Sequence, residues 1–298
     1  MQPPILLVDS SIYVFRAWFT LPDSLCDAQG RPANAALGFV EFAHRLLAER
    51  APSRIAFAFD QSLSSNFRHD IYPDYKANRS PAPVALRQQF DQARAFLRAA
   101  GLCELSSPHH EADDLIGTLA ARERARGGRL LILTADKDLA QLIGPRDQWW
   151  DFPRGEPLDP RALTRKFGVR PEQIADQLAI AGDKADNIPG VPGVGMATAA
   201  KLLRRFGTLD ALLADIPAIG TMKLRGAGRL MQLIDAHQDT IRLARRLTGI
   251  ECAATLPEHA PLARQPPDFD ALENWFDLMA VGAARRASWR ALLTGMPA

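Results

Sequence analysis

The sequence has few features of a secreted, membrane-spanning or zinc–thiolate protein. Its 298 residues include only three cysteines, Cys26, Cys103 and Cys252, with no CxxC spacing. This pattern argues against a disulfide framework and predicts free thiols in a reducing, cytoplasmic compartment. No apolar run reaches the length of a membrane span. Asp9 interrupts the first apolar run, so we expect no signal peptide there.

The chain also has little net charge, and its value of +2 does not by itself indicate a nucleic-acid partner. The distribution of charge is more informative. Residues 201–246 contain nine Lys or Arg residues but only four acids. An ordinary solvated helical face would explain such a segment. Because the acids gather earlier in the chain, the sequence also fits an acidic pocket beside a basic platform.

Three short apolar runs each end on an aspartate. They cover residues 5–9, 55–60 and 130–136 and end on Asp9, Asp60 and Asp136. Continuous apolar runs of this length are typical of buried parallel strands. In an open α/β sheet the ligand site lies beyond the carboxyl ends of the strands. The three carboxylates are therefore predicted to converge on one edge of a sheet.

Other acids lie where they can join this group. Single acids of this kind usually cap helices or form turns, and a pair in the first turn of a helix usually complements its dipole. Gathered carboxylates repel one another unless a cation lies between them, and hard divalent metals prefer oxygen ligands. The sequence thus predicts a metal site. Its candidate ligands are Asp9, Asp60, Glu111, Asp113, Asp114, Asp136, Asp138, Asp183 and Asp186.

The order of patterns along the chain predicts an α/β class with an all-helical subdomain. Up to about residue 150, strand patterns at 4–8, 55–59 and 130–135 alternate with helical patterns at 33–49, 83–99 and 112–126. Trp149, Trp150 and Phe152 indicate a further strand or its flank. We expect a core over 1–160, a helical subdomain over 161–260 and a helical tail over 261–298 that packs on the core.

The connection that follows residue 60 is long for an α/β domain, in which such loops usually have about 2–6 residues. It interleaves aromatic and cationic side chains next to the predicted acidic cluster. Such side chains can stack on bases and hold phosphates. The candidates for nucleic-acid contact are Phe67, Arg68, Tyr72, Tyr75, Lys76 and Arg79.

A glycine-rich segment at 187–195 precedes a helical pattern at 196–206. Glycines permit a tight turn, and backbone N–H groups at a helix amino end favour anions. The segment therefore predicts a cradle for phosphates that ignores base identity. A purely structural helix–turn–helix corner is the alternative. The residues assigned to this cradle are Gly190, Val191, Gly193, Val194, Gly195, Thr198 and Lys201.

Together these motifs resemble the 5′-nuclease family, which includes the 5′–3′ exonuclease domain of bacterial DNA polymerase I and the flap endonucleases. The resemblance covers residues 5–206, in family order, from Asp9 through the 67–79 and 111–117 segments to the glycine-rich hairpin. It implies a PIN-like parallel sheet, a helical arch at about 61–90 and a helix–three-turn–helix module that binds duplex DNA. The family often has glycine after the first aspartate, where this chain has Ser10.

The resemblance also implies two divalent ions, Mg²⁺ or Mn²⁺, and a K⁺ between the hairpin backbone and a DNA phosphate. It assigns one divalent ion to Asp9, Asp60, Glu111 and Asp113, and the second to the remaining candidate ligands. Our hypothesis is phosphodiester hydrolysis with ions about 3.5–4 Å apart, one activating a water and one stabilising the leaving oxygen. Lys76 and Arg79 are the expected contacts to the scissile phosphate. Tyr75 is expected to stack on an unpaired base.

The expected substrate is a 5′ flap, an overhang or a nicked duplex, and the expected form is a standalone monomer. A structure-specific DNA-binding protein without turnover is a rival function, which the complete acid set disfavours. A PIN-type ribonuclease is a second rival, which the Gly/Pro hairpin and the chain length disfavour. A phosphatase with a strand-end nucleophile is a third, but the first strand lacks an Asp-x-Asp pair.

Overall fold

The computed structural model describes residues 3–61, 66–256 and 261–295. Within them lies a five-stranded sheet of order β3-β2-β1-β4-β5. Every neighbouring pair of its strands is parallel. The carboxyl ends of all five strands therefore lie along one edge. The strands are β1 (Ile5–Asp9), β2 (Ile55–Asp60), β3 (Cys103–Ser107), β4 (Leu130–Leu133) and β5 (Gln148–Trp150).

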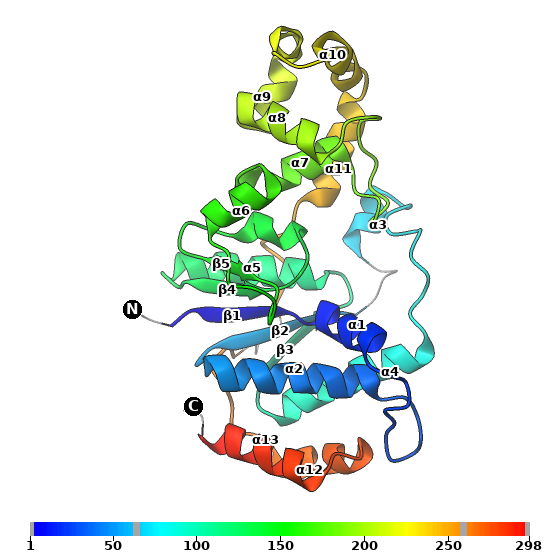
Figure 1. The fold of residues 1–298 in the computed structure, drawn as a ribbon, viewed down its shortest axis with the longest axis vertical. Coiled ribbons are helices and arrows are strands. Elements are labelled where there is room, and N and C mark those ends of the chain that lie inside the picture. Colours follow the sequence, from blue (N-terminus) through cyan, green and yellow to red (C-terminus); the bar gives the residue numbers. More distant parts are fainter. Residues whose placement is uncertain (1–2, 62–65, 257–260, 296–298) are drawn as a thin grey trace.

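Both faces of the sheet are covered, which explains why β1, β2 and β4 are continuous apolar runs. Alternate residues face opposite cores: Leu7 and Ile132 belong to one cluster, and Leu6 and Leu131 belong to the other. Figure 1 shows the helices on either side of the sheet. They are α1 (Ser10–Thr20), α2 (Asn34–Arg50) and α4 (Val84–Ala99) on one face and α5 (Ala112–Ala125) on the other.

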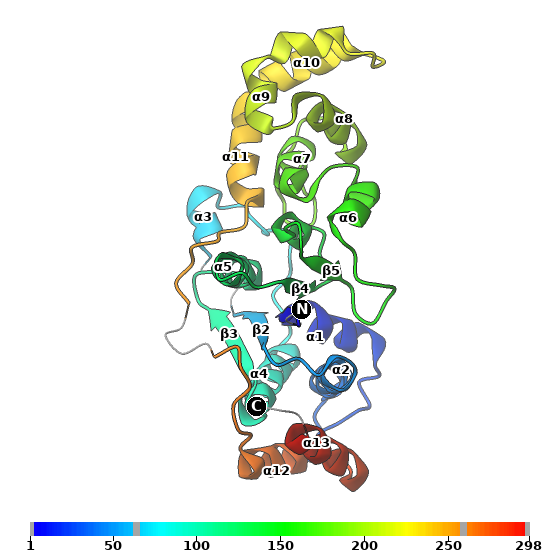
Figure 2. The ribbon, with the colours of Figure 1, turned by 90° about the vertical axis from the view of Figure 1, so that its left-hand side faces the viewer.

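A helical subdomain extends away from the α5 face (Figures 1 and 2). Its elements are η1 (Asp138–Leu142), α6 (Pro160–Phe167), η2 (Pro171–Gln173), α7 (Ile174–Ala181), α8 (Met196–Phe206), α9 (Leu209–Ala214), η3 (Ile216–Thr221), α10 (Ala227–Ala236) and α11 (Gln238–Thr248). Its core is continuous with the α5 face of the sheet. Among the described residues, no helix combines the length and the apolar character needed to cross a bilayer.

The carboxyl-terminal helices form a further layer beneath α2 and α4 (Figure 2). They are α12 (Phe269–Leu278) and α13 (Ala283–Gly295). Trp289 is fully enclosed, with its ring centroid 4.7 Å from that of Phe96 on α4. The indole N–H of Trp275 donates to the carbonyl of Gln92 at 3.0 Å. Large aromatic contacts therefore attach this layer to the sheet domain on the side away from the helical subdomain.

The α/β class with an all-helical subdomain, expected from the sequence, is confirmed. Two elements were missed. Helix α1 begins directly after β1 without a loop, and β3 alternates buried and half-buried residues instead of forming an apolar run. The predicted strand at 130–135 is two residues too long, since β4 ends at Leu133.

The arch expected over about 61–90 contains less helix than its name implies. Its described part contains one short helix, α3 (Phe67–Ile71), then turns, and finally the first residues of α4. Residues 62–65 of this segment lie outside the described residues.

Candidate active site at the carboxyl edge of the sheet

The ends of β1, β2 and β4 bring three aspartates to one edge, as the apolar runs predicted. Asp9 accepts a hydrogen bond from the hydroxyl of Thr134 at 2.8 Å, and that hydroxyl in turn accepts from the backbone N–H of Asp136 at 2.8 Å. Asp60 accepts from the N–H of Ala112, the first residue of α5, at 2.9 Å. Short polar contacts thus fix the carboxylates to neighbouring strands and to α5.

The carboxylates of this edge repel one another. Burial, followed by the charges of Asp60 and Asp136, raises the pKa of Asp9 to about 8. Burial and the charges of Asp136 and Asp9 raise the pKa of Asp113 well above its ordinary value. Burial also raises the pKa of Asp136. Several anions therefore face one small region, and a bound cation would relieve their repulsion.

A second acidic group lies beside the first. Asp138 follows Asp136 and begins η1, with its N–H donating to Asp136 at 2.9 Å. Burial and the charge of Asp136 raise the pKa of Asp138 to about 7. Lys137 donates to Asp183 at 2.6 Å and lies 3.2 Å from Asp138. Burial alone would raise the pKa of Asp183, but the hydrogen bond and charge of Lys137, together with backbone N–H donors, lower it.

The base of the arch closes over the same edge. The ammonium group of Lys76 is 2.6 Å from Glu111 and 3.7 Å from Asp186. Burial alone would raise the pKa of Glu111, but the charges of Lys76 and Arg68, with hydrogen bonds from Lys76 and Tyr75, lower it. Arg79 pairs with Asp186 and is more exposed than Lys76. Both predicted phosphate contacts therefore lie against the acidic cluster, held by two of its members.

The structure corrects the expected role of Tyr75. Its side chain is only 2% exposed, so the ring cannot stack on a base in this arrangement. The phenol instead donates to Glu111 and to Asp186, each at 3.2 Å. Of the other aromatic candidates, Tyr72 is partly buried and packs against the core, and the ring of Phe67 lies against the Arg68 guanidinium. Tyr75 therefore orients two candidate ligands and does not serve as a stacking platform.

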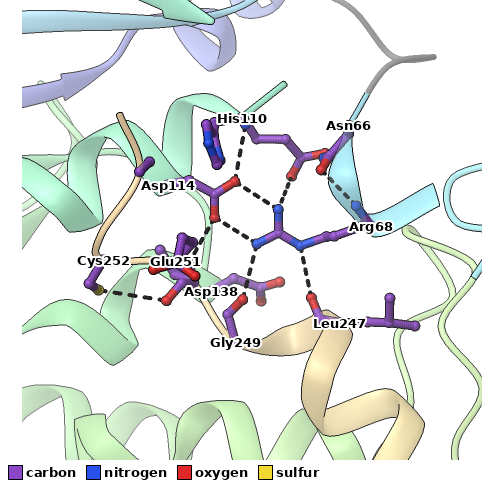
Figure 3. Close-up of polar contacts among 12 residues, drawn as sticks. Asn66, Arg68, His110, Asp114, Asp138, Leu247, Gly249, Glu251 and Cys252 are labelled. Carbon is purple, nitrogen blue, oxygen red and sulfur yellow. Dashed lines mark hydrogen bonds and ion pairs between the residues drawn. The ribbon is translucent and has the colours of Figure 1, made fainter. Parts of the chain in front are cut away.

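The structure also corrects the roles expected of Arg68 and Asp114. They were predicted as a DNA contact and a metal ligand, but they form a buried pair with each other (Figure 3). The guanidinium donates to both carboxylate oxygens of Asp114, at 2.8 and 2.7 Å. Those oxygens also accept from the N–H groups of Glu111 and Glu251, at 3.1 and 2.9 Å. Asp114 is fully buried, and each of its carboxylate oxygens already accepts two hydrogen bonds, so neither is directed toward a metal.

The glycine-rich hairpin is held by its apolar residues and displays its glycines. Val191 and Val194 are 2% and 4% exposed, so their side chains belong to the core and only their backbone is available to a ligand. Gly190 lies so close to the end of α7 that a Cβ atom would meet the carbonyl carbon of Ala181 at 2.3 Å. Gly193 has a φ of +78°.

The end of the hairpin leads into α8, whose amino-terminal amides favour anions. Gly195 occupies its N-cap position. Thr198 is half-buried in the first turn of this helix, and Lys201 is exposed one turn further on. The predicted cradle is thus built from backbone and one flexible cation.

Sequence reasoning missed Lys137, Thr134 and Ser11. Ser11 lies on α1, and its hydroxyl oxygen accepts a hydrogen bond from the backbone N–H of Asp60 at 3.0 Å. Lys137 lies between Asp136 and Asp138 in the sequence, and that position was a usable signal for a cation inside the cluster. The hydroxyls of Thr134 and Ser11 carried no comparable signal, because their contacts depend on how the strands pair.

The donors of this edge fit hard divalent cations. All candidate ligands offer carboxylate oxygens, which suit such ions, and several are raised in pKa by one another. Nevertheless, among residues 3–61, 66–256 and 261–295, no group of three or more His, Cys, Asp or Glu side chains has the arrangement needed to hold a metal ion. Instead, Lys76 and Lys137 form ion pairs with carboxylates of the acidic edge. Two internal cations thus compensate part of the charge.

A parallel sheet with an acidic carboxyl edge, joined to a helical subdomain with a glycine-rich hairpin, is the arrangement expected from the resemblance to the 5′-nuclease family. Family models support this assignment over most of the chain. The 5′-3′ exonuclease N-terminal resolvase-like domain matches residues 4–168, and the 5′-3′ exonuclease C-terminal SAM fold matches residues 169–270. The chain belongs to the 5′-3′ exonuclease family.

Curated relatives agree with this assignment. The chain is 38% identical over 254 residues to DNA polymerase I of Bacillus caldotenax, covering 84% of this chain and 28% of that protein. It is 37% identical over 287 residues to DNA polymerase I of Pseudomonas aeruginosa, covering 93% of this chain and 31% of that protein. The chain therefore spans less than a third of the length of these relatives.

Solved structures show the same fold. The T5 5′-exonuclease with bound divalent metal ions (zinc) is 19% identical, with a TM-score of 0.65 and coverage of 98% of this chain and 99% of that one. The catalytic core of Rad2 in complex with DNA substrate is 15% identical, with a TM-score of 0.63 and coverage of 100% and 93%. At these identities the likeness establishes the architecture.

Proposed function

We propose that this protein hydrolyses DNA phosphodiesters at junctions between single strands and duplex, by stepwise 5′ trimming and by cutting 5′ flaps. The observation that carries the proposal is the meeting of the β1, β2 and β4 aspartates with acids from α5 and the 183–186 loop, beneath the arch cations. The same edge combines a place for cations with a place for phosphate.

The candidate ligands divide into two neighbouring groups. Asp9, Asp60, Glu111 and Asp113 form the first, and Asp136, Asp138, Asp183 and Asp186 the second, with Asp136 close enough to raise the pKa of Asp9. Two divalent ions, Mg²⁺ or Mn²⁺, would supply Lewis acidity for the attacking and the leaving oxygen. Asp114 is left out of this assignment because its oxygens are already engaged.

The arch residues act on the substrate phosphate. Lys76 and Arg79 lie against Glu111 and Asp186, so a phosphate bound at this edge would meet the ammonium of Lys76 and the guanidinium of Arg79 if divalent cations compensated these two carboxylates. Cations fixed in a partly buried site stabilise charge that develops in the transition state. Tyr75 keeps Glu111 and Asp186 oriented through its hydroxyl.

The helical subdomain holds the duplex. The exposed glycines of the hairpin, the amino end of α8 and Lys201 offer contacts to phosphates without reading bases. A K⁺ at this hairpin belongs to the same proposal. The cut position would then follow from the fixed separation between hairpin and acidic edge. A monomeric, cytoplasmic protein suits this role, and its cysteines are free thiols.

One assay tests the proposed function. A flap substrate labelled at its 5′ end and another labelled at its 3′ end are incubated with the protein, with and without Mg²⁺. We expect Mg²⁺-dependent products whose lengths separate mononucleotide release from a single cut at the junction. Binding without cleavage would instead identify a DNA-binding protein without turnover, and preferential cleavage of an RNA flap would identify a ribonuclease.

A further inference from the structure

The pair formed by Arg68 and Asp114 joins three parts of the chain that are distant in sequence. Arg68 lies on α3 at the base of the arch, and Asp114 lies in the first turn of α5. Arg68 also donates to the carbonyls of Leu247 and Gly249, at 3.1 and 3.0 Å. These carbonyls belong to the end of α11 and the segment that follows it (Figure 3).

Asp114 completes the same junction from the other side. One of its oxygens accepts from the N–H of Glu251, and the other from the N–H of Glu111, a candidate ligand. Arg68 and Asp114 are 2% and 0% exposed. A planar guanidinium with five donors can hold a carboxylate and two carbonyls at once, whereas a lysine cannot reproduce this fork.

The neighbouring contacts show that the junction is built into the fold. Gln141 on η1 donates to the carbonyl of Thr248 at 3.1 Å and accepts from the N–H of Ile250 at 3.2 Å. The ring of Phe67 lies against the guanidinium of Arg68, whose Cζ atom is 4.6 Å from the ring centroid. The exit from the helical subdomain is thus fixed to η1, α5 and the arch base together.

We propose that Arg68 and Asp114 are positioning residues that set the arch base and the helical subdomain in register with the acidic edge. This inference rests on the proposed function. Both side chains are buried. Arg68 acts through the arch segment that carries Lys76 and through Glu111, whose carboxylate lies 3.8 Å from the guanidinium. Asp114 acts through the backbone of Glu111. Losing this register would misplace Lys76 and the bound duplex relative to the acids.

A buried pair of this kind also stabilises the fold, so the test must separate stability from register. The Arg68→Met/Asp114→Leu double variant replaces the pair with apolar side chains of similar size, an exchange that buried ion pairs often tolerate. It restores packing but not the hydrogen bonds from Arg68 to the carbonyls of Leu247 and Gly249, nor those that Asp114 accepts from the N–H groups of Glu111 and Glu251. The matched control is Arg124→Met, which removes an ion pair to Asp147 at the opposite end of α5, away from the acidic edge.

The readouts are single-turnover cleavage, flap-DNA affinity in Ca²⁺, thermal midpoint, and hydrogen exchange of residues 66–79 and 247–251. We expect the double variant to fold with a lower thermal midpoint, because two carbonyls and two N–H groups lose their partners, and to exchange faster in both segments. Its cleavage should be slower by about 10²-fold, as a misplacement of roughly 1 Å can produce. Wild type and Arg124→Met should cleave normally.

Cleavage within threefold of wild type by a folded double variant, with unchanged exchange, would overturn the inference and leave the pair a stability element. A loss of DNA affinity at an unchanged cleavage rate would also overturn it and return Arg68 to the DNA contacts. If the double variant does not fold, Asp114→Asn, which keeps the shape and removes the charge, is measured by the same readouts. Absence of cleavage by wild type would instead contradict the proposed function.

Discussion

At the scale of single residues, the acidic edge is a set of anions compensated from within. Lys76 and Lys137 each contact two acids, and Arg79 contacts Asp186, which Lys76 also contacts. Such cations have two effects. They reduce the repulsion between the carboxylates when no metal is bound, and they compete with a metal ion for the same carboxylates. Exchanging one of these charges should therefore alter catalysis much more than folding.

Asp136 offers the clearest single-residue test. We expect Asp136→Asn to abolish most of the hydrolysis while flap-DNA affinity in Ca²⁺ remains close to wild type, because an amide keeps the shape and removes the charge that attracts a divalent ion. Quenched-flow cleavage and fluorescence anisotropy measure the two quantities. The control is Asp91→Asn, a largely exposed position on α4. A near wild-type rate for Asp136→Asn would remove this residue from the ligands.

Lys76 tests the arch. We expect Lys76→Ala to slow single-turnover cleavage by about 10²-fold or more, roughly 2.7 kcal/mol, if its ammonium meets transition-state charge. Lys166→Ala, on α6 beside Trp149, is the control for loss of an exposed lysine. Unchanged single-turnover kinetics in Lys76→Ala would assign this lysine to structure alone.

Some contacts between single residues could be predicted from the sequence, and others could not. The convergence of Asp9, Asp60 and Asp136 was predictable, because parallel strands place their carboxyl ends on one edge. The pairing of Arg68 with Asp114 was not, since the two residues are 46 positions apart and their contact depends on the path of the arch. Burial of Tyr75 was hidden for the same reason.

At the scale of elements, long apolar patterns were read correctly and short or mixed ones were not. Strand β3 was missed because only alternate residues are buried, and α1 because no loop separates it from β1. The hairpin and α8 were visible because glycine spacing and an amphipathic helix are both local signals. What local signals could not reveal is that Val191 and Val194 point into the core.

Gly190 tests the hairpin as an element. A Cβ atom there would approach backbone atoms of Ala181 and Gly182 at 2.3 Å, so the hairpin must shift away from α7. We expect Gly190→Ala to lower both the thermal midpoint and the duplex affinity. Gly228→Ala, in α10 with open space around it, should be neutral or stabilise by up to about 1 kcal/mol. Equal duplex affinity in both variants would separate the hairpin from DNA binding.

At the scale of the whole molecule, acidic and basic regions are segregated. The acids meet at the sheet edge, whereas exposed Lys201, Arg204 and Arg205 lie on α8 in the helical subdomain. The helical subdomain lies at one end of the long molecule and α12–α13 at the other (Figure 1), so under the proposed function duplex would be held away from the acidic edge. Charge segregation, and not the net charge of +2, then governs binding.

This segregation predicts a strong response to salt. Duplex affinity should fall steeply as ionic strength rises, because bound phosphates release counterions. Lys201→Ala should weaken binding for all sequences alike and reduce the slope of log K against log salt by about 1. Titrations at several NaCl concentrations give both slopes. A flat response in wild type would refute binding dominated by the phosphate backbone.

The most direct measurement is anomalous diffraction from crystals soaked in Mn²⁺, with Asp136→Asn crystals treated in the same way. The account predicts anomalous peaks among Asp9, Asp60, Asp113 and Asp136 in the wild type, with Lys76 or Lys137 moved from its present partners, and weaker peaks in the variant. Wild-type crystals without an anomalous peak at this edge would contradict the claim that these carboxylates hold divalent cations.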